Sequence, residues 1–364
     1  MGFKCGIVGL PNVGKSTIFN SLTKANVQAG NYPFCTIEPN NGKVAVPDER
    51  LKKLSSIVKP EQTIPTAIEF VDIAGLVSGA SKGEGLGNKF LANIRETDAV
   101  VHIIRCFKNK NITHVSGKVD PIDDIQTINT ELLLADLELI DKIIIKNKKI
   151  GKYTDSKSIE RLQILQALKA QLESENIPNS LNFNNEQKKY IRQNSLLVYK
   201  PVIYIINIDE GMSRDDLLLQ KTVKFLKKNK AHFVIICATI EAEIAALDNN
   251  NERLEFLKEL GLKEAVLNII IQSVYQILKL QTYFTAGPKE VRAWTIPVGT
   301  TAPKAARKIH TDFERGFIRA EVISFDDYIA CNGDKGAKNT GKSRLEGKEY
   351  IVNDGDIINF KFNV

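Results

Sequence analysis

A glycine-rich motif near the start of the chain constrains the fold more than any other feature. Residues 9–16 read GLPNVGKS, which fits the pattern GxxxxGK[ST]. The strand-like run KCGIV precedes the motif directly, and the helical pattern STIFNSLTK overlaps its end. Glycines let backbone N–H groups wrap phosphates, and the N-terminus of the following helix favours negative charge. This order of strand, loop and helix predicts a nucleoside-triphosphate site, because a chance glycine-rich turn would lack the flanking elements.

The motif suggests a role for each of its residues. Lys15 is expected to reach the β- and γ-phosphates, and the Ser16 hydroxyl is expected to be a ligand of Mg²⁺. The predicted phosphate-binding residues are Asn12, Val13, Gly14, Lys15, Ser16 and Thr17.

Two further segments complete the predicted magnesium site. Asp72 follows the apolar run AIEFV, so it lies at the carboxyl end of a strand, where ligands of open α/β sheets bind. We expect Asp72 to hold Mg²⁺ through a water, and the amide of Gly75 to sense the γ-phosphate. Thr36, in GNYPFCTIEPN, is the candidate threonine that completes the metal shell when triphosphate is bound. A threonine in an ordinary loop is the alternative.

The expected base site departs from the guanine-specific pattern NKxD. After the strand PVIYII the chain reads NIDE, so Ile208 replaces the lysine and Glu210 replaces the aspartate with a side chain one methylene longer. A displaced carboxylate would leave the two guanine donors unpaired, and Asn207 could still accept from the N6 amino group of adenine. The last base-side loop comprises Cys237, Ala238 and Thr239. The alternative is that NIDE is a plain turn and the base binds elsewhere.

The residue that orients the attacking water cannot be the usual glutamine. Leu76 follows Gly75, and its side chain forms no hydrogen bond. Of the four histidines, His102 and His232 lie in strand-like runs, and His310 lies near the carboxyl end of the chain. His114, in the polar loop KNKNITHVSGK, is the histidine expected to be free to swing into a phosphate site. An ordinary exposed loop histidine is the alternative.

The order of apolar patterns predicts an α/β fold with two additions. Short β-rich runs that alternate with helix-length segments indicate a parallel sheet with crossover helices. Residues 121–175 carry apolar side chains every three or four positions, broken by GKYTDS, which predicts an inserted antiparallel helical hairpin. The last 85 residues or so form strand-like runs separated by turns, with a helix expected at 303–310. These patterns predict a small mixed sheet.

Composition excludes several classes of protein. The chain has 364 residues, enough for a sizeable core, and no apolar run approaches the roughly 20 residues that span a bilayer. The amino terminus lacks the apolar core of a signal peptide, so we expect a cytoplasmic protein without a membrane partner. Five scattered cysteines without CxxC indicate neither a disulfide framework nor a zinc site. The net charge of +7 suits a polyanionic partner such as RNA.

The combined motifs resemble those of the YchF family of Obg-like ATPases over essentially the whole chain. The segments that carry the resemblance are GLPNVGKST, NYPFCTIEPN, DIAGLVSGASKGEGLGNKFL, HVSG, NIDE and the terminal EYIVNDGDIINFKFNV. Cys237 departs from the serine that is common in the family. The resemblance implies a P-loop domain of the translation-factor class with a helical insert, and a terminal TGS module with a ubiquitin-like, β-grasp fold. It also implies a preference for ATP over GTP, ribosome binding, and His114 as the catalytic replacement for glutamine.

On this basis we expect four segments. They are a P-loop domain in two parts, 1–120 and 200–279, the inserted hairpin at 121–199, and the TGS module at 280–364.

Two lysine-rich stretches are candidate RNA contacts. One is the predicted hairpin tip, with Lys146, Lys148, Lys149 and Lys152. The other is a glycine-punctuated loop of the terminal module, with Lys335, Lys338, Lys342, Arg344 and Lys348. Lysines on a flexible loop suit contacts with RNA phosphates, although a charge run is also typical of a solvated face.

We therefore expect a Mg²⁺-dependent ATPase that binds the ribosome, with the large subunit as the contact and no DNA specificity, and that acts as a nucleotide switch in translation or a stress response. Two alternatives remain open. One is an Obg-class GTPase, and the other is a nucleic-acid-binding module with incidental hydrolysis.

Overall fold

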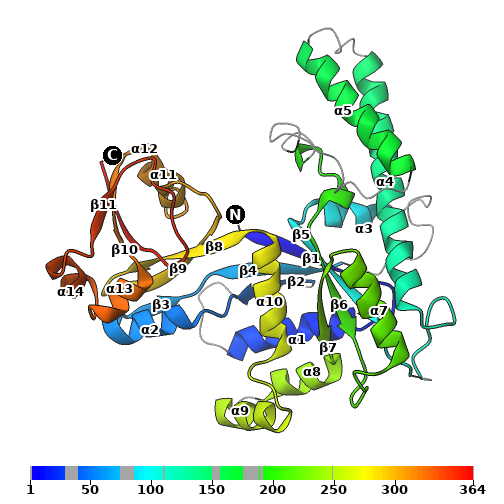
Figure 1. The fold of residues 1–364 in the computed structure, drawn as a ribbon, viewed down its shortest axis with the longest axis horizontal. Coiled ribbons are helices and arrows are strands. Elements are labelled where there is room, and N and C mark those ends of the chain that lie inside the picture. Colours follow the sequence, from blue (N-terminus) through cyan, green and yellow to red (C-terminus); the bar gives the residue numbers. More distant parts are fainter. Residues whose placement is uncertain are drawn as a thin grey trace.

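Two six-stranded sheets organise the part of the chain that the structure describes (Figure 1). The computed structural model describes residues 2–28, 40–73, 86–109, 111–149, 156–174, 188, 192–247 and 249–363. The first sheet has the order β2 (Asn41–Ala45), β4 (Ala67–Asp72), β1 (Phe3–Val8), β5 (Ala99–Arg105), β6 (Val202–Asn207) and β7 (His232–Ile236). All its pairings are parallel except that of β2 with β4, which confirms the predicted parallel sheet.

The middle of the first sheet is fully enclosed. All seven residues of β5 are buried, which agrees with its nearly continuous apolar sequence, AVVHIIR. The helices of this domain are α1 (Lys15–Gln28), α3 (Leu86–Arg95), α7 (Leu217–Lys228), α8 (Ala238–Ala246), α9 (Asn250–Glu259) and α10 (Val266–Ile277). Helix α10 buries Leu267, Ile270, Ile271 and Val274, whose spacing of three to four residues places them on one face, against the sheet. This core fixes the strand ends at which the candidate site lies.

Two long helices project from this domain (Figure 1). Helix α4 (Pro121–Lys149) and helix α5 (Ser156–Glu173) pack on each other, as the apolar spacing predicted. Their own core includes Ile140 and Ile144 of α4 with Leu165 and Leu168 of α5. The first half of α4 instead buries Ile128 in the core of the sheet domain. The hairpin is therefore anchored in the domain of the first sheet by a continuous helix.

The second sheet is mixed and contains the carboxyl-terminal strands. Its order is β11 (Arg344–Glu346), β10 (Phe317–Ile323), β12 (Ile357–Phe362), β8 (Leu280–Ala286), β9 (Glu290–Pro297) and β3 (Gln62–Ile64). Four short helices accompany it: α11 (Ala302–Ala306), α12 (Thr311–Arg315), α13 (Phe325–Ala330) and α14 (Asp334–Asn339). The helix expected at 303–310 is shorter than predicted, because the chain leaves α11 and His310 then caps α12 by accepting from the N–H of Asp312.

A segment from the first part of the chain belongs to this second sheet. Strand β3 pairs in parallel with β9, and helix α2 (Glu49–Val58) inserts Leu51 and Leu54 into the core formed with Phe284 and Val291. Arg50 also donates to the carboxylate of Asp354 at 2.7 Å. The limits expected from sequence, 1–120 and 280–364, assign this segment to the other domain. A three-residue strand carries no local signal of which sheet it joins.

Two further findings concern the part of the chain that the structure describes. Within the described ranges, no helix is long and apolar enough to cross a bilayer. Cys5, Cys106, Cys237 and Cys331 are free thiols, and Cys35 lies outside the described residues.

Candidate nucleotide-binding site

The phosphate loop has the backbone that only glycine permits at two positions. Gly14 has φ +100° and Gly9 has φ +158°. A Cβ added to Gly14 would lie 2.5 Å from Nδ2 of Asn207, and one added to Gly9 would lie 2.6 Å from the carbonyl oxygen of Ile103. The loop is therefore pressed against β5 and β6, and any side chain at either position would displace it.

A cavity of about 420 Å³ opens above this loop. Nine of the residues predicted to bind nucleotide line it: Asn12, Gly14, Lys15, Ser16, Thr17, Asn207, Ile208, Ala238 and Thr239. Three others do not. The side chain of Val13 is buried in the core of the first sheet, Glu210 is exposed, and Cys237 is the residue before helix α8. Phe107, Asn109, Ile112 and Asp209 also line the cavity, although the motifs in the sequence did not predict them.

Lys15 lies at the base of the cavity. Its ammonium donates to the carbonyl oxygen of Leu10 at 2.7 Å, and its side chain is buried. Burial lowers the pKa of Lys15, while the nearby Asp72 opposes that change. A phosphate would offer this buried ammonium a charged acceptor in place of a carbonyl, which is the exchange expected of a phosphate-binding lysine.

Two of the predicted magnesium ligands are adjacent. The Ser16 hydroxyl donates to Oδ2 of Asp72 at 3.3 Å. Burial raises the pKa of Asp72, and Lys15 and Ser16 partly offset it. A hydroxyl and a carboxylate fit Mg²⁺, which prefers oxygen ligands and keeps several waters and phosphate oxygens around it.

The other predicted contacts around the γ-phosphate, Thr36 and Gly75, lie outside the described residues, as does Leu76. In the described part of the chain, no group of three or more histidine, cysteine, aspartate or glutamate side chains could hold a metal ion.

Asn207 connects the phosphate loop to the base-side loop. Its Nδ2 donates to the carbonyl oxygen of Val13 at 3.0 Å, and its Oδ1 accepts from the N–H of Ala238 at 3.0 Å. The side chain is 3% exposed. The expectation that its oxygen meets adenine is therefore not supported, because the amide is already used within the protein. Asn207 instead holds the two loops at a fixed distance from each other.

A buried arginine holds the segment after β5 that lines one side of the cavity. Arg105, at the end of β5, donates from Nε to the carbonyl of Phe107 at 3.2 Å and from Nη2 to the carbonyl of Ile112 at 3.0 Å. It is 1% exposed, its guanidinium lies 4.4 Å from the centre of the Phe107 ring, and burial lowers its pKa. The sequence signal for it was a charged residue at the end of a strand that is otherwise almost entirely apolar.

His114 is neither exposed nor free to swing in this structure. Its side chain is 3% exposed, with Nε2 3.1 Å from Oδ2 of Asp124 and Nδ1 2.8 Å from the hydroxyl of Ser116. Burial raises the pKa of Asp124, and its contact with His114 opposes that rise. Both earlier interpretations of this histidine, a mobile group and an ordinary exposed one, are therefore wrong for this conformation. The reason is tertiary: the first turn of α4 supplies the carboxylate.

The loop that carries His114 nevertheless touches the phosphate loop. Nδ2 of Asn12 donates to the carbonyl oxygen of Thr113 at 3.1 Å. A rearrangement at Asn12 on phosphate binding would therefore act on the residue next to His114.

The carboxyl-terminal lysines lie on an ordered surface. Lys338 belongs to helix α14 and pairs with Asp334 at 2.9 Å and Glu321 at 3.6 Å, and Lys342 pairs with Asp327 at 3.2 Å. The expected flexible loop is therefore a helix and a short strand, because Ala337 is buried in the core against α2. Arg344 is also paired, with Glu346 at 3.9 Å. No ion pair involves Lys335 or Lys348 among the described residues.

The hairpin tip is described only in part. Lys146 and Lys148 are exposed on α4. The side chain of Lys149 and the whole of Lys152 lie outside the described residues.

Comparisons with known proteins cover the same regions. A family model described as "50S ribosome-binding GTPase" matches residues 4–148, and the model YchF-GTPase_C, described as a protein of unknown function, matches residues 280–363. "Ribosome-binding ATPase YchF" of Escherichia coli O157:H7 is 57% identical over the full length of both chains, and that of Bacillus subtilis is 52% identical, again covering both chains in full. The solved "YchF GTPase" of Schizosaccharomyces pombe is 38% identical with a TM-score of 0.87, and the match covers 99% of this chain and 98% of that one.

Proposed function

The chain belongs to the YchF family of P-loop nucleoside-triphosphate hydrolases, and from this we propose that it is a Mg²⁺-dependent ATPase that binds the ribosome and switches its state with the bound nucleotide. The observation that carries the proposal is the single cavity in which Lys15, Ser16 and the loop after β6 converge. The names of the relatives at 57% and 52% identity support the ribosomal partner and, with it, a cytoplasmic protein.

The residues at the base-side loop favour ATP over GTP. Ile208 lines the cavity where guanine-specific sites place a lysine, and Glu210, at the aspartate position, is exposed and outside the cavity. A buried pair of donors left without acceptors costs a ligand several kcal/mol in typical cases, so guanine loses the contact that usually selects it.

A GTPase is the second candidate, and one observation favours it. Asp209, which immediately precedes Glu210, carries a carboxyl group and does line the cavity. The relative from Schizosaccharomyces pombe is also named a GTPase. If Asp209 accepts from guanine, Asp209→Asn weakens GTP binding and leaves ATP binding nearly unchanged.

Competition between ATP and GTP for the purified protein decides between the two candidates. Our proposal expects ATP to bind at least as tightly as GTP. Tighter binding of GTP, lost in Asp209→Asn, would favour the GTPase.

For hydrolysis we propose that His114 orients the attacking water. The usual glutamine is replaced by Leu76, whose side chain forms no hydrogen bond. Bound Mg²⁺ would stabilise negative charge on the phosphate oxygens, with Ser16 and Asp72 as the residues that hold it. The side chain of His114 must leave Asp124 before it can orient a water, because both ring nitrogens are within hydrogen-bond distance of protein partners. The contact between Asn12 and Thr113 is the route by which phosphate binding would trigger this release.

The switch would reach the helical hairpin through Arg95 and Asp136. Arg95, the last residue of α3, donates from Nη1 to Oδ1 of Asp136 on α4 at 3.1 Å and to the carbonyl oxygen of Ser195 at 2.9 Å. Oδ2 of Asp136 accepts from the N–H of Val198 at 3.0 Å. Arg95 therefore links α3 to α4 through a partly buried ion pair, so a displacement of α3 would pass to the hairpin.

We propose the large ribosomal subunit as the contact, through RNA phosphates and without specificity for DNA. The family description "50S ribosome-binding GTPase" supports this choice. Lys335 and Lys348, which form no ion pair with the residues that the structure describes, are candidates for phosphate contacts, together with the exposed Lys146 and Lys148 at the hairpin. Co-sedimentation with separated subunits at increasing salt tests this proposal. Binding to the small subunit alone would contradict it.

A further inference from the structure

Strand β7 is the open edge of the first sheet. In the sheet order it follows β6 and has no strand beyond it within the described residues. The carbonyl oxygen of Ile236 accepts from the N–H of Ile208, so this residue faces the ladder. In a parallel pair such residues alternate with those that face outward, which places the backbone groups of Phe233 and Ile235 on the free side. An unpaired row of donors and acceptors is a template for another strand.

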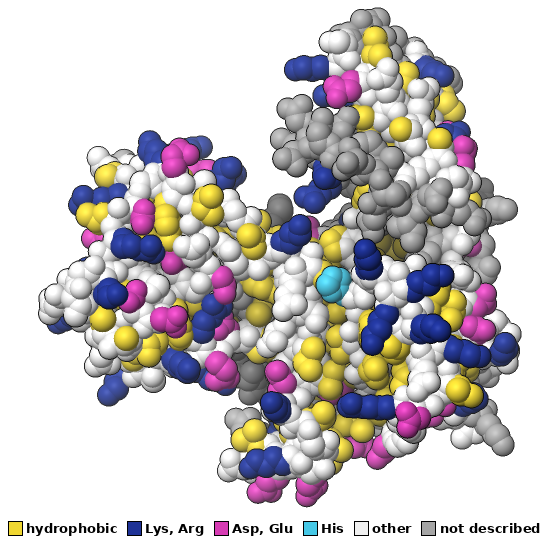
Figure 2. Space-filling model, in the orientation of Figure 1, with side chains coloured by type: hydrophobic (Ala, Val, Ile, Leu, Met, Phe, Trp, Pro, Cys, Tyr) yellow, Lys and Arg dark blue, Asp and Glu magenta, His cyan; other side chains and the backbone are white. Residues whose placement is uncertain are grey.

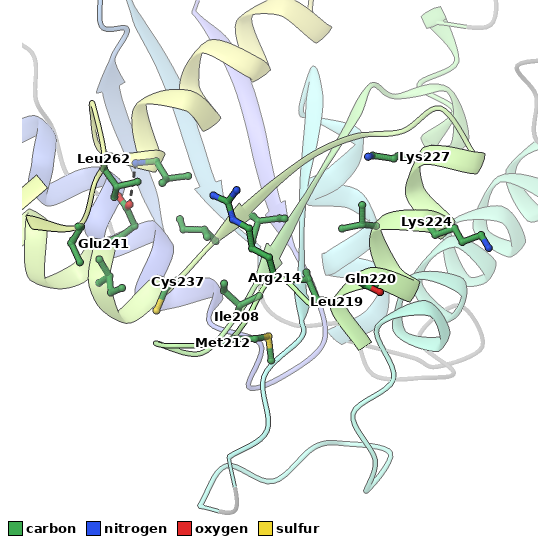
Figure 3. Close-up of a pocket in the computed structure, with 16 residues that line it drawn as sticks. Ile208, Met212, Arg214, Leu219, Gln220, Lys224, Lys227, Cys237, Glu241 and Leu262 are labelled. Atoms are coloured by element: carbon green, nitrogen blue, oxygen red, sulfur yellow. Dashed lines mark hydrogen bonds between the residues drawn. The ribbon is translucent and has the colours of Figure 1, made fainter. Parts of the chain in front are cut away.

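An apolar groove of about 650 Å³ runs along this edge (Figure 3). Helix α7 provides one wall, with Leu219 and Val223. Helix α8 and the segment that leads into α10 provide the other, with Ile240 and Leu262. Ile235 lies between the walls and is 37% exposed. A peptide that adds to β7 would place alternate side chains on the two walls, which is the arrangement that strand addition requires.

The charges around the groove are positive. Arg214, Lys224 and Lys227 line it, all three are exposed, and none forms an ion pair with another described residue. Figure 2 shows lysine and arginine side chains over apolar ones on the face that carries α7 and β7. The acidic group of the groove, Glu241, is buried and accepts from the N–H groups of Val266 at 3.0 Å and Leu267 at 3.3 Å. The carboxylate of Glu241 is therefore satisfied by backbone N–H groups inside the protein. The exposed charges that line the groove are positive and attract an anion.

We propose that this groove binds an extended acidic segment of a partner protein, which adds as a strand to β7. The free backbone edge would supply hydrogen bonds, the two apolar walls would accept alternate side chains, and the three cations would select acidic residues. RNA would meet the cations but would leave the strand edge and the apolar walls unused. The groove shares Ile208 with the nucleotide cavity but contains no residue of the phosphate loop, and the inference does not depend on which nucleotide the protein hydrolyses.

The probe for the test is a fluorescein-labelled peptide of sequence EIEVEIE, whose binding to the full chain is followed by fluorescence anisotropy. We expect saturable binding that weakens with salt. The same peptide with every glutamate replaced by lysine should bind at least tenfold more weakly. A peptide with alternate backbone amides methylated keeps its charge but cannot extend the sheet, and it should lose at least tenfold as well.

Variants of the protein test the same contacts from the other side. Lys224→Glu combined with Lys227→Glu should weaken binding at least tenfold, whereas Lys221→Glu, an exposed position on α7 outside the groove, should have little effect. Ile235→Pro removes an outward-facing N–H and is expected to block strand addition. If that variant fails to fold, the methylated peptide on the unmodified protein makes the same test. Nucleotide hydrolysis should be unchanged in the lysine variants.

Four outcomes would overturn the proposal. One is the absence of peptide binding, and another is equal binding of the methylated peptide, which would indicate charge attraction alone. A third is tighter binding of a twelve-nucleotide RNA than of the peptide, if this RNA binding is lost in the double lysine variant. The fourth is a dimer, seen by sedimentation velocity, that disappears with Ile235→Pro, which would make a second copy of the chain the occupant.

Discussion

Nε2 of His114 lies 3.1 Å from Oδ2 of Asp124, and both side chains are buried. The pair joins the loop that follows β5 to the first turn of α4, the helix that continues into the hairpin. The same loop contacts the phosphate loop through Thr113 and Asn12. The histidine that we propose for hydrolysis is thus part of the contact between the nucleotide site and the hairpin, and its release would change both.

His114→Ala is expected to lower kcat strongly and to leave ATP affinity nearly unchanged, because the interaction is proposed to form in the transition state. Single-turnover hydrolysis and equilibrium binding of ATP measure the two effects. Asp124→Ala serves as the control for structure, since it removes the partner and leaves the imidazole. If both variants lose stability equally and neither changes kcat, His114 has only a structural role.

Base preference should respond to two substitutions in the loop after β6. Ile208→Lys together with Glu210→Asp restores the pattern NKxD, and we expect the ratio of GTP to ATP affinity to rise at least tenfold, which is about 1.4 kcal/mol. Competition binding with labelled ATP measures the ratio. An unchanged ratio would indicate that the base contacts other residues.

Gly14→Ala should damage nucleotide binding through Asn207. The added Cβ would meet Nδ2 of Asn207 at 2.5 Å, and the positive φ adds strain of about 1–3 kcal/mol. We expect a lower melting temperature and a loss of ATP affinity. Gly211→Ala is the matched control, because Gly211 also has positive φ but has nothing within 4 Å of its added Cβ. Equal loss of ATP affinity in both variants would contradict the role of Asn207.

The buried Asp136 should contribute a pH dependence of stability. Burial raises its pKa to about 6 in spite of Arg95 and the N–H of Val198. Between about pH 4 and 6 the folded state then binds more protons at this group than the unfolded state, so its contribution to stability falls as pH rises. Denaturant unfolding of Asp136→Asn across this range should lack that fall. A parallel pH profile for the variant and the unmodified protein would show that Asp136 titrates normally.

Ribosome binding should depend on unpaired lysines more than on paired ones. Lys335→Ala with Lys348→Ala should weaken co-sedimentation with the large subunit and reduce its salt dependence. Lys338→Ala is the matched control, because its ammonium is already paired with Asp334 and Glu321. Basal ATP hydrolysis should remain. A weakening as large in the control would mean that pairing does not decide which lysines bind.

Truncation before Gln281 is a poor test of the same question. Removing β8 to β12 would expose Leu51 and Leu54 of α2, which are buried against that sheet. Loss of hydrolysis in such a variant would then report unfolding of the first domain rather than a role in ribosome binding.

Patterns in the linear sequence predict the parts of this protein whose chemistry is local. The phosphate loop followed from glycine spacing between a strand and a helix, and the parallel sheet and helical hairpin followed from the periodicity of apolar residues. These features depend on neighbours within a few positions, so a linear pattern records them. Residues 12–17 were predicted to bind phosphate for the same reason, and all of them except Val13 line the cavity.

Which distant groups meet depends instead on how the chain packs in three dimensions. His114 is hydrogen-bonded to the buried Asp124. The amide of Asn207 is hydrogen-bonded to the carbonyl of Val13 and the N–H of Ala238. Strand β3 pairs with β9 in the second sheet. Each of these contacts depends on how the chain folds back on itself. The local sequence around a histidine, an asparagine or a short strand is the same whether or not its partner lies beside it in the folded protein. The three-dimensional arrangement therefore determined which polar groups remain free for a ligand.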